Sequence, residues 1–300
     1  MIFRKFLMFA SRNAIPKFTL EVKSDNAGTS GTDQFTIPTI AGTYLYDYTT
    51  SDGQSGTGLT GATTITFASG AGTYEIYITG TFPRIYFFNG GDKLKLLRIL
   101  EWGSYGEGIT DQSQAFFGCT NLTSIANDVY NINLIENGLS MFLNVPLTSL
   151  PSGMTLDNLV TGTNMFYGSS ISTLPSGMTL SNLVTGTSMF RSNTFTTLPS
   201  GMTLGNLVTG TNMFLFVSLS DIPSGMTLPS LTNGVNIFNG STIGTTRYSQ
   251  LLVDLESGNA NNSVTFHGGS SLYNATGETA RNILTGVGRN WTITDGGLEP

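Results

Sequence analysis

The chain has 300 residues and a net charge of −6; only 11% of its residues are charged, 11% are aromatic and 37 are glycine. A globular chain usually contains about 25% charged residues, but the aromatic content supplies enough apolar surface for a folded core. A single histidine and a single cysteine exclude a His/Cys metal site, a disulfide and a Cys/His dyad within the chain. The acidic balance argues against nucleic acid as a partner.

Residues 1–17 form a basic arm on an acidic chain, since residues 1–23 hold five basic side chains and one acid. The longest uncharged run there, Phe6 to Ser11, is shorter than the roughly 7 to 15 apolar residues of a secretory signal. No run approaches the roughly 20 apolar residues of a membrane span, so we expect no membrane insertion. The arm is either an anchor in a larger assembly or an element that packs on the next domain. The candidate anchor residues are Phe3, Arg4, Lys5, Phe6, Phe9 and Arg12.

Residues 18–83 alternate short β-prone runs with turn clusters. The runs are rich in β-branched and aromatic residues and occupy positions 18–23, 34–40, 43–50, 64–68 and 73–80. This pattern predicts a small β-sandwich. The run Gly72 to Gly80 resembles the closing strand of immunoglobulin-like domains of the polycystic-kidney-disease type, and Tyr46 to Gly53 is similar to their Asp/Gly-rich hairpin. The resemblance implies a spacer module without chemistry.

Residues 84–246 contain an internal repeat. Proline recurs every 24 residues from Pro151 to Pro223, and methionine recurs at the same step from Met154 to Met226. The unit reads L-x-x-L-P-S-G-M-T-L-x-N-L-V-T-G-T-x-M-F, and such a period is typical of a solenoid. No 24-residue coil closes a core alone, so each must stack on its neighbour. We expect one short strand per coil at the L-x-x-L segment, and a loop or short helical turn at L-x-N-L-V.

Upstream, Ala115 to Ile125 keeps the register and resembles the A-F-x-x-C-x-x-L-x-x-I core of BspA-like leucine-rich repeats, which are known from bacterial surface adhesins and phage-encoded proteins. The later coils resemble the related class of bacterial surface lipoproteins. The resemblance covers about Leu94 to Thr246, and it implies that Cys119 is a core ladder residue.

Residues 247–300 break the period and predict a C-terminal cap. Tyr248 to Leu255 and Ala275 to Leu284 have helical spacing, while Val264 to Phe266 and Trp291 to Thr294 are strand-like. A solenoid needs such a terminal unit, because its last coil otherwise exposes the core. The predicted fold is therefore mainly β: an immunoglobulin-like β-sandwich, a leucine-rich-repeat solenoid and an α/β cap.

The sequence carries no enzyme signature. A glycosidase needs two facing carboxylates, yet residues 141–246 contain only three charged residues, Asp157, Arg191 and Asp221, and these occupy different positions of the coil. Other acids, such as Asp92 and Glu101, are expected in solvated loops or salt bridges. We expect His267 to be structural, and we expect no catalytic residue, metal or cofactor.

Binding is favoured over catalysis because one edge of the copied coils diverges. The segment after each Met-Phe pair differs from coil to coil, which is typical of a binding edge in solenoids, although drift in exposed loops explains it equally well. The candidate receptor-binding residues are Tyr167, Arg191, Asn193, Leu215 and Phe216.

One function is favoured and two alternatives are kept. The favoured one is a non-enzymatic phage tail or capsid appendage on the virion surface. It would bind other virion proteins through the arm and a host-surface glycan or protein through the solenoid, with a homo-oligomer left open. The alternatives are a purely structural decoration protein and a bacterial cell-surface adhesin.

Overall fold

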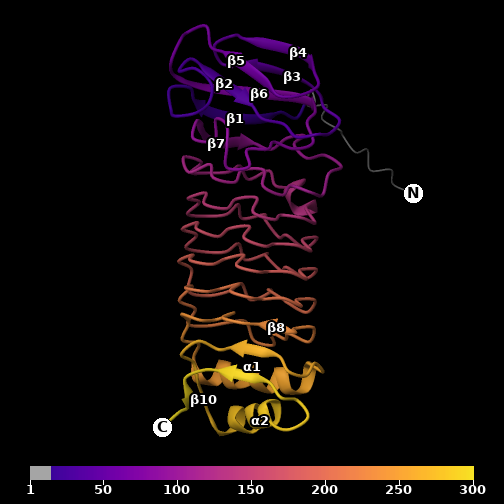
Figure 1. Ribbon diagram of the computed structural model, residues 1–300, viewed down its shortest axis with the longest axis vertical. Coiled ribbons are helices and arrows are strands. Elements are labelled where there is room, and N and C mark those ends of the chain that lie inside the picture. Colours follow the sequence, from indigo (N-terminus) through magenta and orange to yellow (C-terminus); the bar gives the residue numbers. More distant parts are fainter. Residues whose placement is uncertain (1–14) are drawn as a thin grey trace, which may run out of the picture.

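The computed structural model describes residues 15–300, which form an elongated molecule with a β-rich unit at one end, a stack of coils in the middle and an α/β unit at the other end (Figure 1). The described part is mainly β, with twelve strands and two α-helices within residues 15–300. The candidate anchor residues Phe3, Arg4, Lys5, Phe6, Phe9 and Arg12 lie outside the described residues.

The N-terminal unit contains two antiparallel sheets. The larger has the order β4-β3-β6-β1-β7 and the smaller pairs β2 with β5. The strands are β1 (Phe18–Lys23), β2 (Gln34–Ile37), β3 (Leu45–Thr50), β4 (Ser55–Leu59), β5 (Thr63–Thr66), β6 (Thr73–Thr81) and β7 (Leu96–Glu101). In β6, buried Tyr74, Ile76 and Ile78 alternate with more exposed neighbours, as the period of two requires. The five runs predicted as strands all contain observed strands.

Strand β7 joins the N-terminal unit to the stack. Leu20 of β1 lies opposite Ile76 of β6 on one side and opposite Ile99 of β7 on the other. Arg98 of β7 also forms a parallel bridge with Ser124 of the next coil. Although β7 lies within the range predicted for the solenoid, it therefore completes the sheet of the preceding unit as well.

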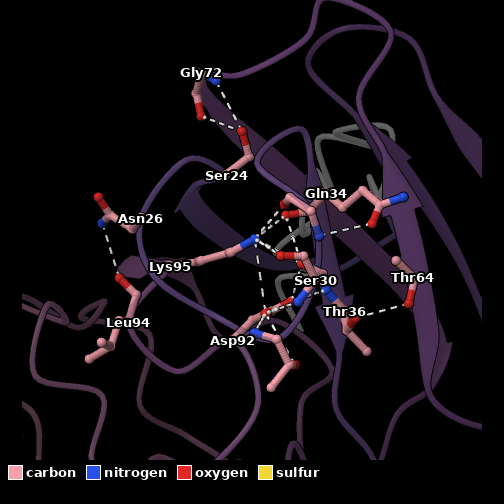
Figure 2. Close-up of polar contacts among 12 residues, drawn as sticks. Ser24, Asn26, Ser30, Gln34, Thr36, Thr64, Gly72, Asp92, Leu94 and Lys95 are labelled. Carbon is pink, nitrogen blue, oxygen red and sulfur yellow. Dashed lines mark hydrogen bonds and ion pairs between the residues drawn. The ribbon is translucent and has the colours of Figure 1, made fainter.

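A buried carboxylate fastens the loop before β2 to this junction (Figure 2). Asp92 is 1% exposed, so of the two roles expected for it, a solvated loop or a salt bridge, it has the second. Its Oδ1 accepts hydrogen bonds from the backbone N–H groups of Thr29 at 2.8 Å and Ser30 at 3.0 Å. Its Oδ2 accepts from Ser30 Oγ and from the N–H of Thr36, both at 2.7 Å. Burial alone would raise the pKa of Asp92, but these hydrogen bonds and the charge of Lys95 outweigh it and lower the pKa.

Lys95, three residues after Asp92, completes the network (Figure 2). Its ammonium group is fully buried and lies 4.0 Å from Asp92 Oδ1. It donates to the carbonyl oxygens of Gly31 at 2.7 Å and Gln34 at 2.9 Å, and to Ser30 Oγ at 2.8 Å. A buried charge is tolerated only when paired and hydrogen-bonded, and both charges meet that condition. The network links segments about 60 residues apart in sequence.

The middle of the molecule is a stack of coils joined by parallel bridges. The bridges connect equivalent positions of successive coils and run through Asp111, Asn137, Thr161, Thr185, Thr209 and Asn233. This ladder starts at the end of the L-x-N-L-V run, where the Val184 N–H donates to the Val160 carbonyl at 2.9 Å. The L-x-N-L-V run itself forms a turn without strand, as expected, and the bridge is made by the threonine that follows it. The L-x-x-L segments, where we expected strands, carry only the bridges Arg98–Ser124 and Thr197–Asp221 among the described residues.

Phenylalanine and methionine ladders fill the coils. Six phenylalanine rings, one per coil, stack with centroids 5.4 to 5.8 Å apart and interplanar angles of 2° to 11°. They are Phe116, Phe142, Phe166, Phe190, Phe214 and Phe238. Met154 and its equivalents are buried, and so is Cys119, whose pKa is raised by burial. The methionines of the Met-Phe pairs leave little room beside them, because a Cβ on Gly186 would lie 2.9 Å from Met213 Sδ.

The C-terminal unit closes the stack. Short strand β8 (Asn233–Gly234) of the last coil pairs in parallel with β9 (Thr265–His267), which pairs with β11 (Thr292–Thr294). The unit also contains α1 (Thr245–Gly258), β10 (Leu272–Tyr273), α2 (Ala275–Thr285) and β12 (Gly297–Leu298). The 3-10 helix η1 (Ile132–Leu134) lies earlier, in the stack. Phe266 of β9 meets Phe238 edge-on at 6.0 Å, which ends the phenylalanine ladder. Both predicted helices and both predicted strands of this region are present.

Candidate functional site

A row of aromatic and cationic side chains follows one edge of the stack. Each coil places a residue at the same position just after its buried phenylalanine, because backbone hydrogen bonds link Gly118 to Leu143, Asn144 to Tyr167 and Gly168 to Arg191. We call the side chains that emerge there the aromatic edge. It comprises Phe88, Phe117, Tyr167 and Arg191 at this position, and Phe216 one residue further along its own coil.

Three of the predicted residues come together in the aromatic edge. The guanidinium carbon of Arg191 lies 4.9 Å from the ring centroid of Tyr167 and 5.7 Å from that of Phe216. Arg191 therefore lies between two aromatic rings from the coils on either side. Each such cation–π contact is worth about 0.5–1 kcal/mol at an exposed site. The contacts hold the cation in one orientation at the surface.

Phe216 occupies a position that suits phenylalanine poorly. Its φ is 62°, in the left-handed region, and its side chain is 60% exposed. Bulky residues are rare in this region because the Cβ crowds the backbone. The equivalent positions of the other coils hold small or turn-forming residues, namely Gly118, Asn144, Gly168, Ser192 and Gly240. An exposed ring in this conformation adds nothing to the core and strains the backbone.

Arg191 also departs from what stability alone requires. No side-chain hydrogen bond or salt bridge of Arg191 exists within residues 15–300, and its Nε is buried without an acceptor. A buried donor left unsatisfied costs about 1–3 kcal/mol. Of the two acids in residues 141–246, Asp221 pairs with Arg247 instead, at 3.4 Å. The two Nη groups of Arg191 are therefore free to meet a ligand, whereas its Nε is covered.

Two predicted contact residues lie inside the molecule, so their assignment as surface contacts is wrong. Asn193 is 3% exposed, and its amide donates to the carbonyl oxygens of Phe166 at 2.9 Å and Phe190 at 3.0 Å. Leu215 is 6% exposed. At a corner of the coil the chain turns a side chain inward to satisfy backbone carbonyls. The period already contained this signal, since Asn193 is 24 residues after Ser169 and before Val217, both of which are buried.

The N-terminal end of the aromatic edge escaped the sequence analysis. Phe88 is 53% exposed, stacks on Tyr86 at 5.5 Å and meets Phe117 at 6.5 Å. Arg84 lies over the Tyr86 ring at 5.1 Å. The Asn89 N–H donates to the Phe117 carbonyl, which makes this segment an additional coil of the stack. Its spacing differs from 24 residues, so the repeat pattern did not reveal it.

A cleft adjoins this end of the edge, at the junction between the N-terminal unit and the stack. It has a volume of about 390 Å³ and its lining includes Tyr44, Arg84, Glu107 and Asp111. Arg84 pairs with Asp111 at 3.1 Å, and the Tyr44 hydroxyl donates to the Arg84 carbonyl at 2.7 Å. These polar groups satisfy one another, which favours a structural role for them.

His267 has structural partners in the C-terminal unit. Its Nδ1 accepts a hydrogen bond from the Gly269 N–H at 3.1 Å, and burial lowers its pKa. The nearby Asp295 carboxylate is engaged by the Tyr248 hydroxyl at 3.0 Å and by Arg281 Nε at 2.8 Å. Within residues 15–300, no three His, Cys, Asp or Glu side chains are grouped so that they could hold a metal ion.

Among the described helices, none is both long enough and apolar enough to cross a membrane.

Comparison of the chain with protein-family models, with curated proteins and with solved structures finds no match in any of the three. The aromatic edge must therefore be interpreted from its own chemistry.

Proposed function

We propose that this protein is a non-enzymatic recognition protein, in which an immunoglobulin-like sandwich and a leucine-rich-repeat solenoid with an α/β cap display the aromatic edge to a host-surface glycan or protein. The parallel ladder and the stacked core residues support the solenoid assignment, and the two antiparallel sheets support the sandwich assignment. The elongated arrangement suits a role in which one end is anchored and one long edge meets a partner.

One observation carries this proposal. Otherwise copied coils depart from the repeat at Tyr167, Arg191 and Phe216, where an unpartnered cation is held between two rings and one ring has a strained backbone. Features that cost stability cluster at functional sites, because stability alone would remove them.

We place the protein on a virion surface, as a tail or capsid appendage bound to other virion proteins through the arm of residues 1–17. The resemblance to phage-encoded repeat proteins and the basic arm support this placement, and a bacterial cell surface is the alternative. Deleting residues 1–16 should abolish incorporation into the parent particle without unfolding the body. Retained incorporation at normal stoichiometry would refute the anchor.

A second candidate, a purely structural decoration protein, is favoured by the rigid junction. β7 and the buried pair of Asp92 and Lys95 tie the N-terminal unit to the stack, which makes a stiff rod suited to reinforcement. A decoration protein would need this rigidity and no exposed recognition surface.

The two candidates are separated by replacing Tyr167, Arg191 and Phe216 together with serine. Recognition predicts lower adsorption to host cells without a lower melting temperature, because none of the three side chains belongs to the buried core. A matched control replaces Tyr130, which is 77% exposed, and Arg247, both outside the aromatic edge. Equal adsorption of the wild type and both variants would favour the decoration role.

A further inference from the structure

We propose that Tyr167, Arg191 and Phe216 bind a glycan that carries isolated carboxylate groups, such as a uronic or sialic acid among neutral sugars. This inference rests on the proposed recognition function and specifies its ligand. Its basis is the juxtaposition of a guanidinium that has no partner within residues 15–300 with two partly exposed aromatic rings, on coils that are otherwise almost free of charge.

The guanidinium of Arg191 is suited to a carboxylate. Arginine presents a planar fork of donors that matches the two oxygens of a carboxylate, and such paired hydrogen bonds are roughly twice as strong as neutral ones. The molecule uses this pairing elsewhere, since Arg98 donates through Nε and Nη2 to the two carboxylate oxygens of Glu21. Arg281 likewise contacts Asp295. Arg191 keeps its Nε buried, so the edge that it presents is formed by its two Nη groups, and within residues 15–300 no acid receives them.

The two rings suit a sugar beside that carboxylate. The apolar C–H face of a sugar ring packs against the electron-rich face of an aromatic ring, while its hydroxyl groups remain in water. Phe216 is 60% exposed, and the equivalent position of the next coil is Gly240, which has no side chain to cover it. Because the rings also hold Arg191 in place, less rotamer entropy is lost on binding.

Charge limits how acidic the ligand is. The chain has a net charge of −6, and Arg191 is the single basic residue between positions 141 and 246. A densely charged polymer such as nucleic acid or a heavily sulfated glycan would meet one cation and a repulsive body. A glycan with widely spaced carboxylates presents one charge to Arg191 and neutral rings to the rest of the edge.

The test is an array of oligosaccharides that contain glucuronate, galacturonate or sialate, each printed beside its carboxyl-reduced counterpart and probed with the full chain. We expect binding to at least one acidic member and at least about tenfold weaker binding to its reduced form, as expected for loss of a charge-assisted pair. Arg191→Gln should remove this preference, and Arg191→Lys should restore only part of it because lysine lacks the fork. Arg247→Gln is the matched control and should retain it.

Other outcomes would overturn the inference in distinguishable ways. Equal binding of acidic and reduced sugars, with loss on Tyr167→Ser, would leave recognition standing but assign a neutral glycan. Binding of polyglutamate or of sulfated sugars alone would assign a different anion. If no sugar binds while the triple serine variant still lowers host adsorption, the ligand is a protein and only this inference fails. If adsorption is also unchanged, the proposed function fails with it.

Discussion

Phe190 and Phe216 lie in neighbouring coils, and removing their rings should have very different effects on the stability of the protein. Phe190 is fully buried, and its ring centroid lies 5.6 Å from that of Phe166 and 5.8 Å from that of Phe214. It also meets Phe195 edge-on at 5.7 Å. Phe216 is 60% exposed and has a φ of 62°. The same residue type therefore tests whether stacking of the coils supplies the stability of the molecule.

The expected magnitudes follow from burial and backbone conformation. Phe190→Ala removes a buried ring and leaves a cavity, which costs about 3–5 kcal/mol. The upper half of that range is expected, since three ring contacts worth about 0.5–1.5 kcal/mol each are lost as well. Phe216→Gly removes little buried surface and relieves a left-handed conformation that costs a side-chain-bearing residue about 1 kcal/mol. The lost cation–π contact with Arg191, worth about 0.5–1 kcal/mol, offsets this gain, so stability should stay within about 1 kcal/mol of the wild type.

Urea unfolding followed by tryptophan fluorescence measures both variants. The two tryptophans, Trp102 and Trp291, are buried and lie toward opposite ends of the described chain, so they report on both ends of the stack. Each coil contacts only its neighbours. If the stack nevertheless unfolds as one unit, Phe190→Ala should lower the urea midpoint at both tryptophans. A loss below about 1 kcal/mol for Phe190→Ala, or an equal loss for Phe216→Gly, would refute the ladder as the source of stability.

Two further predictions concern steric fit and pH. Gly186→Ala should destabilise the protein by about 1–3 kcal/mol, because the new methyl group meets Met213 Sδ. Gly201→Ala, where the added Cβ has no neighbour within 4 Å, should stay within about 0.5 kcal/mol of the wild type in the same denaturation assay. Asp92→Asn should cost about 3–5 kcal/mol at neutral pH, because it leaves Lys95 buried without its counter-charge. The folded state lowers the pKa of Asp92, so its stabilisation is complete above the unfolded pKa of about 3.9 and is lost as the pH falls through the folded value. The stability difference between Asp92→Asn and the wild type should therefore shrink in acid; a constant difference from pH 7 to pH 2 would contradict the assignment.

Much of the fold follows from local pattern. The 24-residue recurrence of proline and methionine identified the coils and predicted which methionines and phenylalanines are buried, because identical coils bury identical positions. Alternation identified five strands of the N-terminal unit but neither β4 nor β7, and helical spacing identified α1 and α2. The divergent edge pointed to Tyr167, Arg191 and Phe216, although not to their mutual contact.

At the corners of the coils, the sequence does not show which side chains are buried and which are exposed. A strand reverses its side chains every residue, but the coil has turns at which this alternation fails, so Asn193 was wrongly expected at the surface. The continuous row of parallel bridges lies at Thr161 and its equivalents, whereas the L-x-x-L segments are joined by fewer bridges and by single hydrogen bonds, such as that from the Ser172 N–H to the Thr148 carbonyl. The apolar spacing of L-x-x-L shows burial and does not show how regularly a segment pairs its backbone.

The sequence by itself determined the repeat, the residues that stack within it and the scarcity of charge along it, since these depend on periodicity and composition. Only the tertiary structure decided that β7 completes the first sheet, that Asp92 and Lys95 are buried together, and that Arg191 lies between two rings. Each of these depends on residues of different coils or units meeting in space. A local pattern specifies which side chains of a segment are buried. The packing of the segments specifies which residues those side chains contact.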